Sequence, residues 1–317
     1  MARPLRFIPP GCLVEVTTRT IQGRLLLKPS PELNDIILGV IGKAQDLYRM
    51  AVHGFAVASN HCHVLLSPTS AQQLARFMQY LNANMAKEAA RLHDWPDRVW
   101  SRRYRAIVVV DEQAAHARMR YLLSHGTKEG LVAGAAAWPG ANCIATLTRG
   151  ERLRGTWLDR SAEYVARASG KHVLPGQFAK TFDVRLTPLP CLRHLDSDQQ
   201  QAHYRRVVHE IDVAAAAANK AKGRQPLGVA RILAQDPHHR PASPDRSPAP
   251  LVHAHDKEKG HEFRVAYRAF VSDFRAGVAR LFGQAKDIAR LFPDWAFPPA
   301  PRFNARPEAA AESAAAA

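Results

Sequence analysis

The stretch VHGFAVASNHCHVLLS, residues 52–67, predicts two short strands that meet at a turn around Asn60. Alternate residues of a strand point to the same face. His61 and His63 are therefore aimed to one side, while Cys62 points into the core with its apolar neighbours. Two imidazoles on one face can begin a metal site. A purely structural histidine pair is the other interpretation, because the chain has 15 histidines.

The segments around this strand pair alternate between strand and helix patterns. Ser30 followed by Pro31 is typical of a helix N-terminus, and Ser70 with Gln73 matches a capping box. Apolar residues then recur at helical spacing behind both caps. The predicted elements are a strand at 11–20, a helix at 31–48, the strand pair, a helix at 70–92, a strand at 100–111 and a helix at 112–125.

This order predicts an α+β fold of the ferredoxin-like or RRM-like kind, an antiparallel sheet with helices on one face. A mainly helical C-terminal extension follows. The predicted divisions are a catalytic domain at 1–135, a loop-rich and helical extension at 136–223, a Pro/His/Arg-rich linker at 224–255, and an amphipathic helix with a disordered tail at 256–317.

Composition indicates a basic protein that binds a polyanion. Lysine and arginine number 44 against 28 acidic residues, a net charge of +16 over 317 residues. Nucleic acid is the commonest such partner, although a basic solvated surface gives the same count. The sequence has neither a membrane span nor a secretory signal, so we expect a cytoplasmic, nucleoid-associated protein that does not bind membranes. The four cysteines are far apart, which favours reduced thiols.

Four arginines gather near the predicted strand at 100–111, and they are candidate DNA-binding residues: Arg98, Arg102, Arg103 and Arg105. Trp100 and Tyr104 lie among them, and their rings could stack on bases. A solvated basic turn is the alternative.

The helix at 112–125 carries Tyr121 and His125, which are four residues apart and share a helix face. Gly126 follows as the predicted left-handed cap. A tyrosine on a helix is more often a packing residue than a nucleophile, so its meaning depends on whether this helix faces the histidine pair.

Taken together, these features resemble the single-tyrosine HUH transposases, named for a histidine, hydrophobic residue, histidine triplet. The resemblance is strongest to the group associated with repetitive extragenic palindromic (REP) elements, which has an IS200-like transposase domain. It covers residues 8–135 and rests on three motifs in the expected order, SNHCHVLL at 59–66, WSRRYRAIVVVD at 100–111 and RYLLSHGTKEGLV at 120–132.

The resemblance implies cleavage and joining of single-stranded or hairpin DNA by a monomer or homodimer. Tyr121 would attack a phosphate and give a 5′-phosphotyrosine with a free 3′-hydroxyl. His61 and His63 would hold a divalent metal, Mg²⁺ or Mn²⁺. His125 stands where the family usually has an amide ligand, and three nitrogen ligands favour Mn²⁺, Co²⁺ or Zn²⁺.

Two other functions are compatible with the sequence. One is a catalytically inactive relative that binds palindromic DNA through its basic surface. The other is a zinc hydrolase that uses His61, His63 and His125, although no carboxylate is spaced as its general base.

Overall fold

The computed structural model describes residues 5–242, 249–282, 292–293 and 296–297. Its centre is a five-stranded sheet in the order β2-β3-β1-β4-β7. The first four strands pair antiparallel, and β7 is added parallel to β4. The order of β1 to β4 is the ferredoxin-like order, so the predicted α+β class is confirmed. The strands are β1 (Leu13–Arg19), β2 (Ala51–Ala58), β3 (His61–Ser67), β4 (Arg105–Val109) and β7 (Val252–His253).

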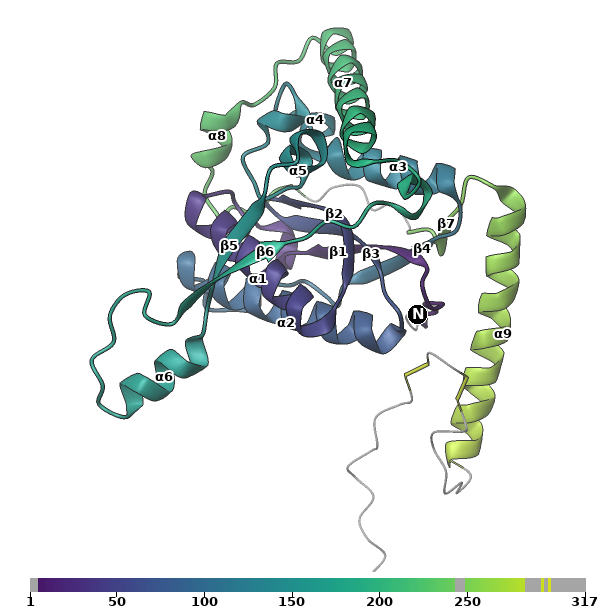
Figure 1. Cartoon of the computed structure of the whole chain (residues 1–317), viewed down its shortest axis with the longest axis horizontal. Helices are drawn as coiled ribbons and strands as arrows, with labels where there is room; N and C mark the ends of the chain where they lie inside the picture. The colour runs from purple at the N-terminus through teal and green to yellow at the C-terminus, as the bar shows by residue number, and fades with distance from the viewer. Residues whose placement is uncertain (1–4, 243–248, 283–291, 294–295, 298–317) are drawn as a thin grey trace, which may run out of the picture. The chain divides into compact units, whose positions relative to one another are not determined.

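Helices cover both faces of this sheet (Figure 1). On one side lie α1 (Pro31–Tyr48) and α2 (Ala71–Leu92); on the other lie α3 (Glu112–Leu123) and α4 (His125–Lys128). The strand pleat shows which residues face which helices. Thr18 donates to Asn82 of α2 at 3.4 Å, whereas Glu15, on the opposite face of β1, contacts Arg118 of α3 at 2.8 Å. The sequence predicted helices on one face; α3 and α4 cover the second.

The helix starts follow their cap residues. The Ser30 hydroxyl accepts from the Leu33 amide at 3.1 Å with Pro31 in the first turn, and Ser70 accepts from Gln73 at 3.0 Å. These caps satisfy amide groups that have no partner inside the helix. They fix where α1 and α2 begin and therefore how both helices lie on the sheet.

A β-hairpin crosses α1 on the side away from the sheet. It consists of β5 (Leu153–Leu158) and β6 (Ala179–Val184), with α6 (Arg160–Ala168) between them. Close approach depends on glycines: a Cβ added to Gly155 would lie 2.2 Å from the Asp35 carbonyl oxygen and 2.3 Å from the Gly39 nitrogen. The sequence predicted only loops and short elements here, because neither strand has one fully buried face.

The region beyond the hairpin is more ordered than predicted. α7 (Ser197–Ala221) starts at a capping box between Asp196 and Gln199, within the extension at 136–223 that was predicted to be partly helical. The segment expected to be an extended linker contains α8 (Val229–Leu233) and β7, and Ile232 is fully buried beside Trp138. A short helix, α5 (Ile144–Arg149), precedes the hairpin.

The last helix, α9 (Lys257–Phe282), lies in the segment 256–317, for which the sequence predicted an amphipathic helix followed by a tail. The chain divides into two compact units, Ile8–Ala266 and the combination of Met1–Phe7 with Tyr267–Ala317. In the second unit, the ring of Phe7 packs on Phe270 with centroids 5.0 Å apart. Most of the predicted disordered tail lies outside the described residues. None of the described helices is both long and apolar enough to cross a membrane.

Candidate active site

Three buried imidazoles converge on the face of the sheet that α3 and α4 cover. His61 and His63 come from β3 and His125 is the first residue of α4, and one ring nitrogen from each lies within 4.8 Å of the others. Their exposed fractions are 8%, 6% and 6%. Cys62, between the two strand histidines, is buried on the opposite face, as the alternation predicts. All four cysteines are free.

Hydrogen bonds fix the orientation of the two strand imidazoles. Asn60 donates through Nδ2 to the Gly23 carbonyl, so its Oδ1 faces His61 Nδ1 at 2.5 Å and accepts a proton from it. Likewise, Glu15 Oε1 accepts from His63 Nδ1 at 2.9 Å. Each Nε2 is then left with its lone pair. This tautomer is the one that metal-binding histidines use when a polar neighbour holds the other nitrogen.

Nε2 of His61 faces Nε2 of His125 directly. Burial, followed by the charge of neighbouring histidines, lowers the pKa of His61 well below its usual value. The same causes, together with Lys128, lower the pKa of His125 to about 3. Both imidazoles are therefore neutral near pH 7, and a neutral imidazole has a nitrogen lone pair that can bind a cation.

This donor set fits a divalent metal ion. Neutral imidazoles are ligands for Mn²⁺, Co²⁺ and Zn²⁺, and a buried polar cluster with outer hydrogen-bond partners is the usual surrounding of such an ion. Among the residues that the structure describes, no other group of histidines, cysteines and carboxylates has this geometry.

A break in the helix brings His125 into the site. α3 ends at Leu123, Ser124 has φ −80° and ψ 0°, and α4 restarts at His125. The prediction that Gly126 is a left-handed cap is wrong, since it lies inside α4 and the left-handed glycine is Gly130, with φ 68°. Gly126 instead gives room for packing, because an added Cβ would lie 2.9 Å from Val132 and 3.1 Å from Trp138.

Tyr121, the predicted nucleophile, lies beside the three imidazoles. Its ring centroid is 5.5 Å from that of His63 and 5.4 Å from that of His125. The Arg118 guanidinium lies 4.1 Å from the ring centroid and the Lys128 ammonium 4.4 Å. Burial raises the pKa of Tyr121, and the charge of Arg118 opposes that shift.

Glu15 is a part of the site that sequence reasoning missed. It is 3% exposed, and besides His63 it contacts Arg118 through Nε at 2.8 Å and His253 of β7 through Nε2 at 2.8 Å. Burial alone would raise the pKa of Glu15, but the contacts with His253, His63 and Arg118 outweigh burial and lower it. A charged residue between Val14 and Val16 on an apolar strand was the available signal.

The predicted DNA-binding arginines lie near the site but not in it. Arg105 on β4 is in register with Thr17, whose other neighbour is His63, so these three side chains share one row of the sheet. Arg19, exposed and missed by the sequence analysis, pairs with His61 in the next row.

The other three arginines lie in the loop before β4 and are exposed: Arg98, Arg102 and Arg103. The amide of Ser101 in this loop donates to the Arg19 carbonyl at 3.0 Å, which holds the loop at the His61 end of β1. The two aromatic residues differ from expectation. Tyr104 is 9% exposed, so its ring has no free face on which a base could stack. Trp100 is half-buried, and its indole donates to the Asn82 carbonyl at 2.8 Å.

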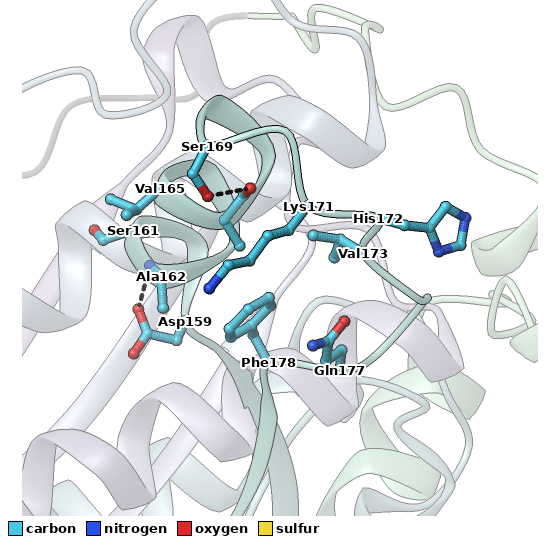
Figure 2. Close-up of a pocket in the computed structure, with 11 residues that line it drawn as sticks. Asp159, Ser161, Ala162, Val165, Ser169, Lys171, His172, Val173, Gln177 and Phe178 are labelled. Carbon is cyan, nitrogen blue, oxygen red and sulfur yellow. Dashed lines mark hydrogen bonds between the residues drawn. The ribbon is translucent and has the colours of Figure 1, made fainter.

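A pocket lies away from this site, between α6 and the loop that follows it (Figure 2). Three of its polar side chains hold the local backbone. Asp159 accepts from Ala162, Ser169 donates to Ala166, and Gln177 accepts from Leu174. These groups therefore stabilise the segment from β5 through α6 to β6, called the β5–β6 arm below, rather than form a reactive cluster.

Part of the chain matches a known protein family. Residues 25–124 match the family described as IS200-like transposases, a range that includes His61, His63 and Tyr121. A search of curated proteins gave no significant match.

Two solved structures are similar to parts of the chain. One is a REP-associated tyrosine transposase bound to a REP hairpin, at 14% identity, 47% coverage of this chain and 87% of that chain, with a TM-score of 0.41. The other is a protein assigned as a transposase from Deinococcus radiodurans R1, at 14% identity, 38% coverage of this chain and 94% of that chain, with a TM-score of 0.28.

Proposed function

We propose that this chain, which contains a domain of the IS200-like transposase family, cleaves and joins single-stranded or hairpin DNA through Tyr121 with the help of a divalent metal. One observation supports the proposal above the others. The tyrosine lies in ring contact with His63 and His125, two members of a buried cluster of three imidazoles. All these groups come from one chain, which is compatible with action as a monomer.

The chemistry is a substitution at phosphorus. The Tyr121 oxygen forms a bond to phosphorus as the bond to the 3′-oxygen breaks. The tyrosine loses its proton, the leaving 3′-oxygen gains one, and the DNA is left with a 5′-phosphotyrosine and a 3′-hydroxyl. Because the new ester conserves the energy of the phosphodiester, no nucleotide cofactor is needed to rejoin the strand.

Each group has a part in this step. His61, His63 and His125 would hold an ion that supplies positive charge to the scissile phosphate. Arg118 and Lys128 flank the tyrosine ring and favour its anionic form, which is needed because burial raises its pKa. The exposed Arg19 and Arg105 lie on the same face of the sheet and would hold the DNA backbone.

The test is an adduct that survives denaturant. The full-length protein is incubated with Mn²⁺ and single-stranded or hairpin oligonucleotides from the flanks of its own gene, then separated on a denaturing gel. We expect a covalent product that Tyr121→Phe abolishes. Tyr164→Phe is the matched control, since Tyr164 is exposed on α6 and should leave the yield unchanged.

Two results would contradict the proposal. An adduct that persists in Tyr121→Phe assigns the nucleophile elsewhere. Salt-sensitive DNA binding that gives no adduct with any divalent metal, and that is unaffected by His61→Ala, identifies an inactive DNA-binding relative instead.

A further inference from the structure

We infer that Glu15 is a positioning residue that couples the metal ligands to the nucleophile, and that His253, supplied by the downstream region, completes its setting. The inference rests on the proposed function for the role of Tyr121. It extends the catalytic centre to two residues outside the matched family range of 25–124. Neither residue touches the reacting atoms; both act through others.

The first step concerns the orientation of His63. Its Nδ1 lies 2.9 Å from Glu15 and 3.1 Å from the Thr17 hydroxyl, both on the neighbouring strand β1. A carboxylate acceptor fixes the ring, keeps the proton on Nδ1 and makes Nε2 a stronger ligand. Thr17 alone could not do this, because a hydroxyl can rotate to donate or accept.

The second step concerns the nucleophile. Arg118 donates through an NH2 nitrogen to Glu15 at 2.9 Å, and its Nε lies 2.8 Å from the other carboxylate oxygen. The guanidinium also lies over the ring of Tyr121. This charge-assisted hydrogen bond and the close ion pair beside it hold the guanidinium in place. One carboxylate thus orients a metal ligand on one side and the neighbour of the nucleophile on the other.

The third step concerns the origin of His253. Its strand β7 has two residues, with Val252 paired to Val108 and His253 to Val109. The Val110 amide donates to the His253 carbonyl at 3.1 Å. Immediately afterwards, the Asp111 carboxylate accepts from the His255 and Asp256 amides at 2.7 and 3.1 Å.

The segment is therefore held on both sides of His253, and its imidazole is left pointing at Glu15. A buried carboxylate is costly unless it is paired and hydrogen-bonded. Arg118 and the two histidines together surround Glu15, which is 3% exposed. If His253 is removed, one carboxylate oxygen is left with Arg118 as its partner, and we expect Glu15 to turn away from His63.

The test measures metal binding on the full-length protein without DNA. Mn²⁺ alone is titrated by calorimetry, and the visible absorption spectrum of bound Co²⁺ reports the ligand geometry. Loss of such an outer partner typically weakens metal binding about 10- to 100-fold. We expect Glu15→Gln to raise the Mn²⁺ dissociation constant in that range and to alter the Co²⁺ spectrum, and His253→Ala to raise the constant by a smaller factor.

The chain offers matched controls. Glu88→Gln also neutralises a buried carboxylate bonded to arginine, but away from the site. His255→Ala removes an exposed histidine two residues from His253. Both should bind Mn²⁺ as the wild type does. His253→Asn keeps a donor for Glu15 and should recover part of the affinity that His253→Ala loses, a rescue that a packing role would not give.

The outcomes separate this inference from the proposed function. Wild-type Mn²⁺ affinity and Co²⁺ spectrum in both Glu15→Gln and His253→Ala would overturn the inference, whatever the DNA chemistry. Weakened metal binding in these variants, with no adduct formed even by the wild type, would support the inference and reject the nuclease. If circular dichroism shows Glu15→Gln to be unfolded, His253→Ala decides the matter: unchanged affinity overturns the inference.

Discussion

Two buried glutamates, Glu15 and Glu88, both bind arginine but differ in their other partners. Glu15 is 3% exposed and Glu88 is 6% exposed, and each is bonded to arginine. In both cases burial would raise the pKa of the carboxyl and its partners outweigh burial and lower it. The remaining partners differ. Glu15 also reaches two imidazoles, whereas Glu88 of α2 binds Arg160 of α6 through both oxygens, and Arg91.

The difference shows what a buried carboxylate can be used for. Glu88 holds the β5–β6 arm on α2 through its ion pair with Arg160. The side chains of Arg160 and Arg91 are 36% and 46% exposed, so solvent weakens both ion pairs. Glu15 is enclosed, and two of its partners belong to the proposed site: His63 is a proposed metal ligand and Arg118 lies on the proposed nucleophile. We therefore expect changes at Glu88 to alter stability alone and changes at Glu15 to alter metal binding. The following predictions test that division.

The largest effect should come from breaking the attachment of the arm without touching a charge. Gly155→Ala places a Cβ 2.2 Å from the Asp35 carbonyl oxygen and forces β5 away from α1. We expect a loss of about 3 kcal/mol in the free energy of unfolding, the upper range for overpacking. Urea denaturation measures it, with Thr156→Ala on the same strand as the control. The Mn²⁺ dissociation constant of Gly155→Ala should equal that of the wild type. A large increase would mean that the β5–β6 arm and the histidine site are coupled.

Bound metal should stabilise the protein, and this stabilisation should depend on the histidine site next to Glu15 and not on Glu88. At an Mn²⁺ concentration one hundred times the dissociation constant, the free energy of unfolding should rise by about 2.7 kcal/mol, because the ion binds only the folded chain. Paired urea denaturations with and without Mn²⁺ measure the increment. Glu88→Gln should show the same increment as wild type, and His61→Ala should lose most of it. An increment of full size in His61→Ala would mean that the ion binds elsewhere.

Neutralising Glu88 should cost less. Removing one partner of a buried ion pair is expensive, but these arginines are partly exposed, so we expect Glu88→Gln to lower the free energy of unfolding by about 1–2 kcal/mol. The exposed Glu32, which also contacts Arg91, supplies the control Glu32→Gln, with little effect expected. If Glu88→Gln were neutral, the arm would be held by packing alone.

The smallest effect concerns pH. Because the pKa of Glu88 is lower in the folded protein than in the unfolded chain, its contribution is fully present above the usual glutamate value of about 4.3 and is lost as the pH falls through the folded value. The stability difference between wild type and Glu88→Gln should therefore narrow below about pH 5. Urea midpoints at several pH values follow it. A stability difference that grows on acidification would contradict a lowered pKa of Glu88 in the folded protein.

The sequence predicted those parts of the fold whose causes are local. α1 begins at Pro31 because Ser30 caps it, and the strand pair around Asn60 follows from two apolar runs. The grouping of Tyr121 with His125 was also accessible, since residues four apart meet on a helix. That this helix faces the β3 histidines required the resemblance to a family, because helix spacing does not say which face of a sheet the helix covers.

The missed features depend on partners far along the chain. Glu15 reads as an ordinary polar position of a strand until β7 and α3 are placed around it. His253 lies on a two-residue strand, which is too short for any periodic signal, in a segment whose composition indicates a linker. Gly126 was misassigned because a glycine near a helix end predicts a cap, whereas the contact with Trp138 that requires it comes from the tertiary fold.

The late position of β7 also has a consequence for protein synthesis. Translation proceeds from the N-terminus at about 5–20 residues per second, so His253 leaves the ribosome on the order of ten seconds after His125. During that interval the nascent chain already contains Tyr121 and its histidines but lacks the last neighbour of Glu15. A message cut short before residue 253 would thus yield a chain that has the residues of the proposed site but lacks one neighbour of Glu15.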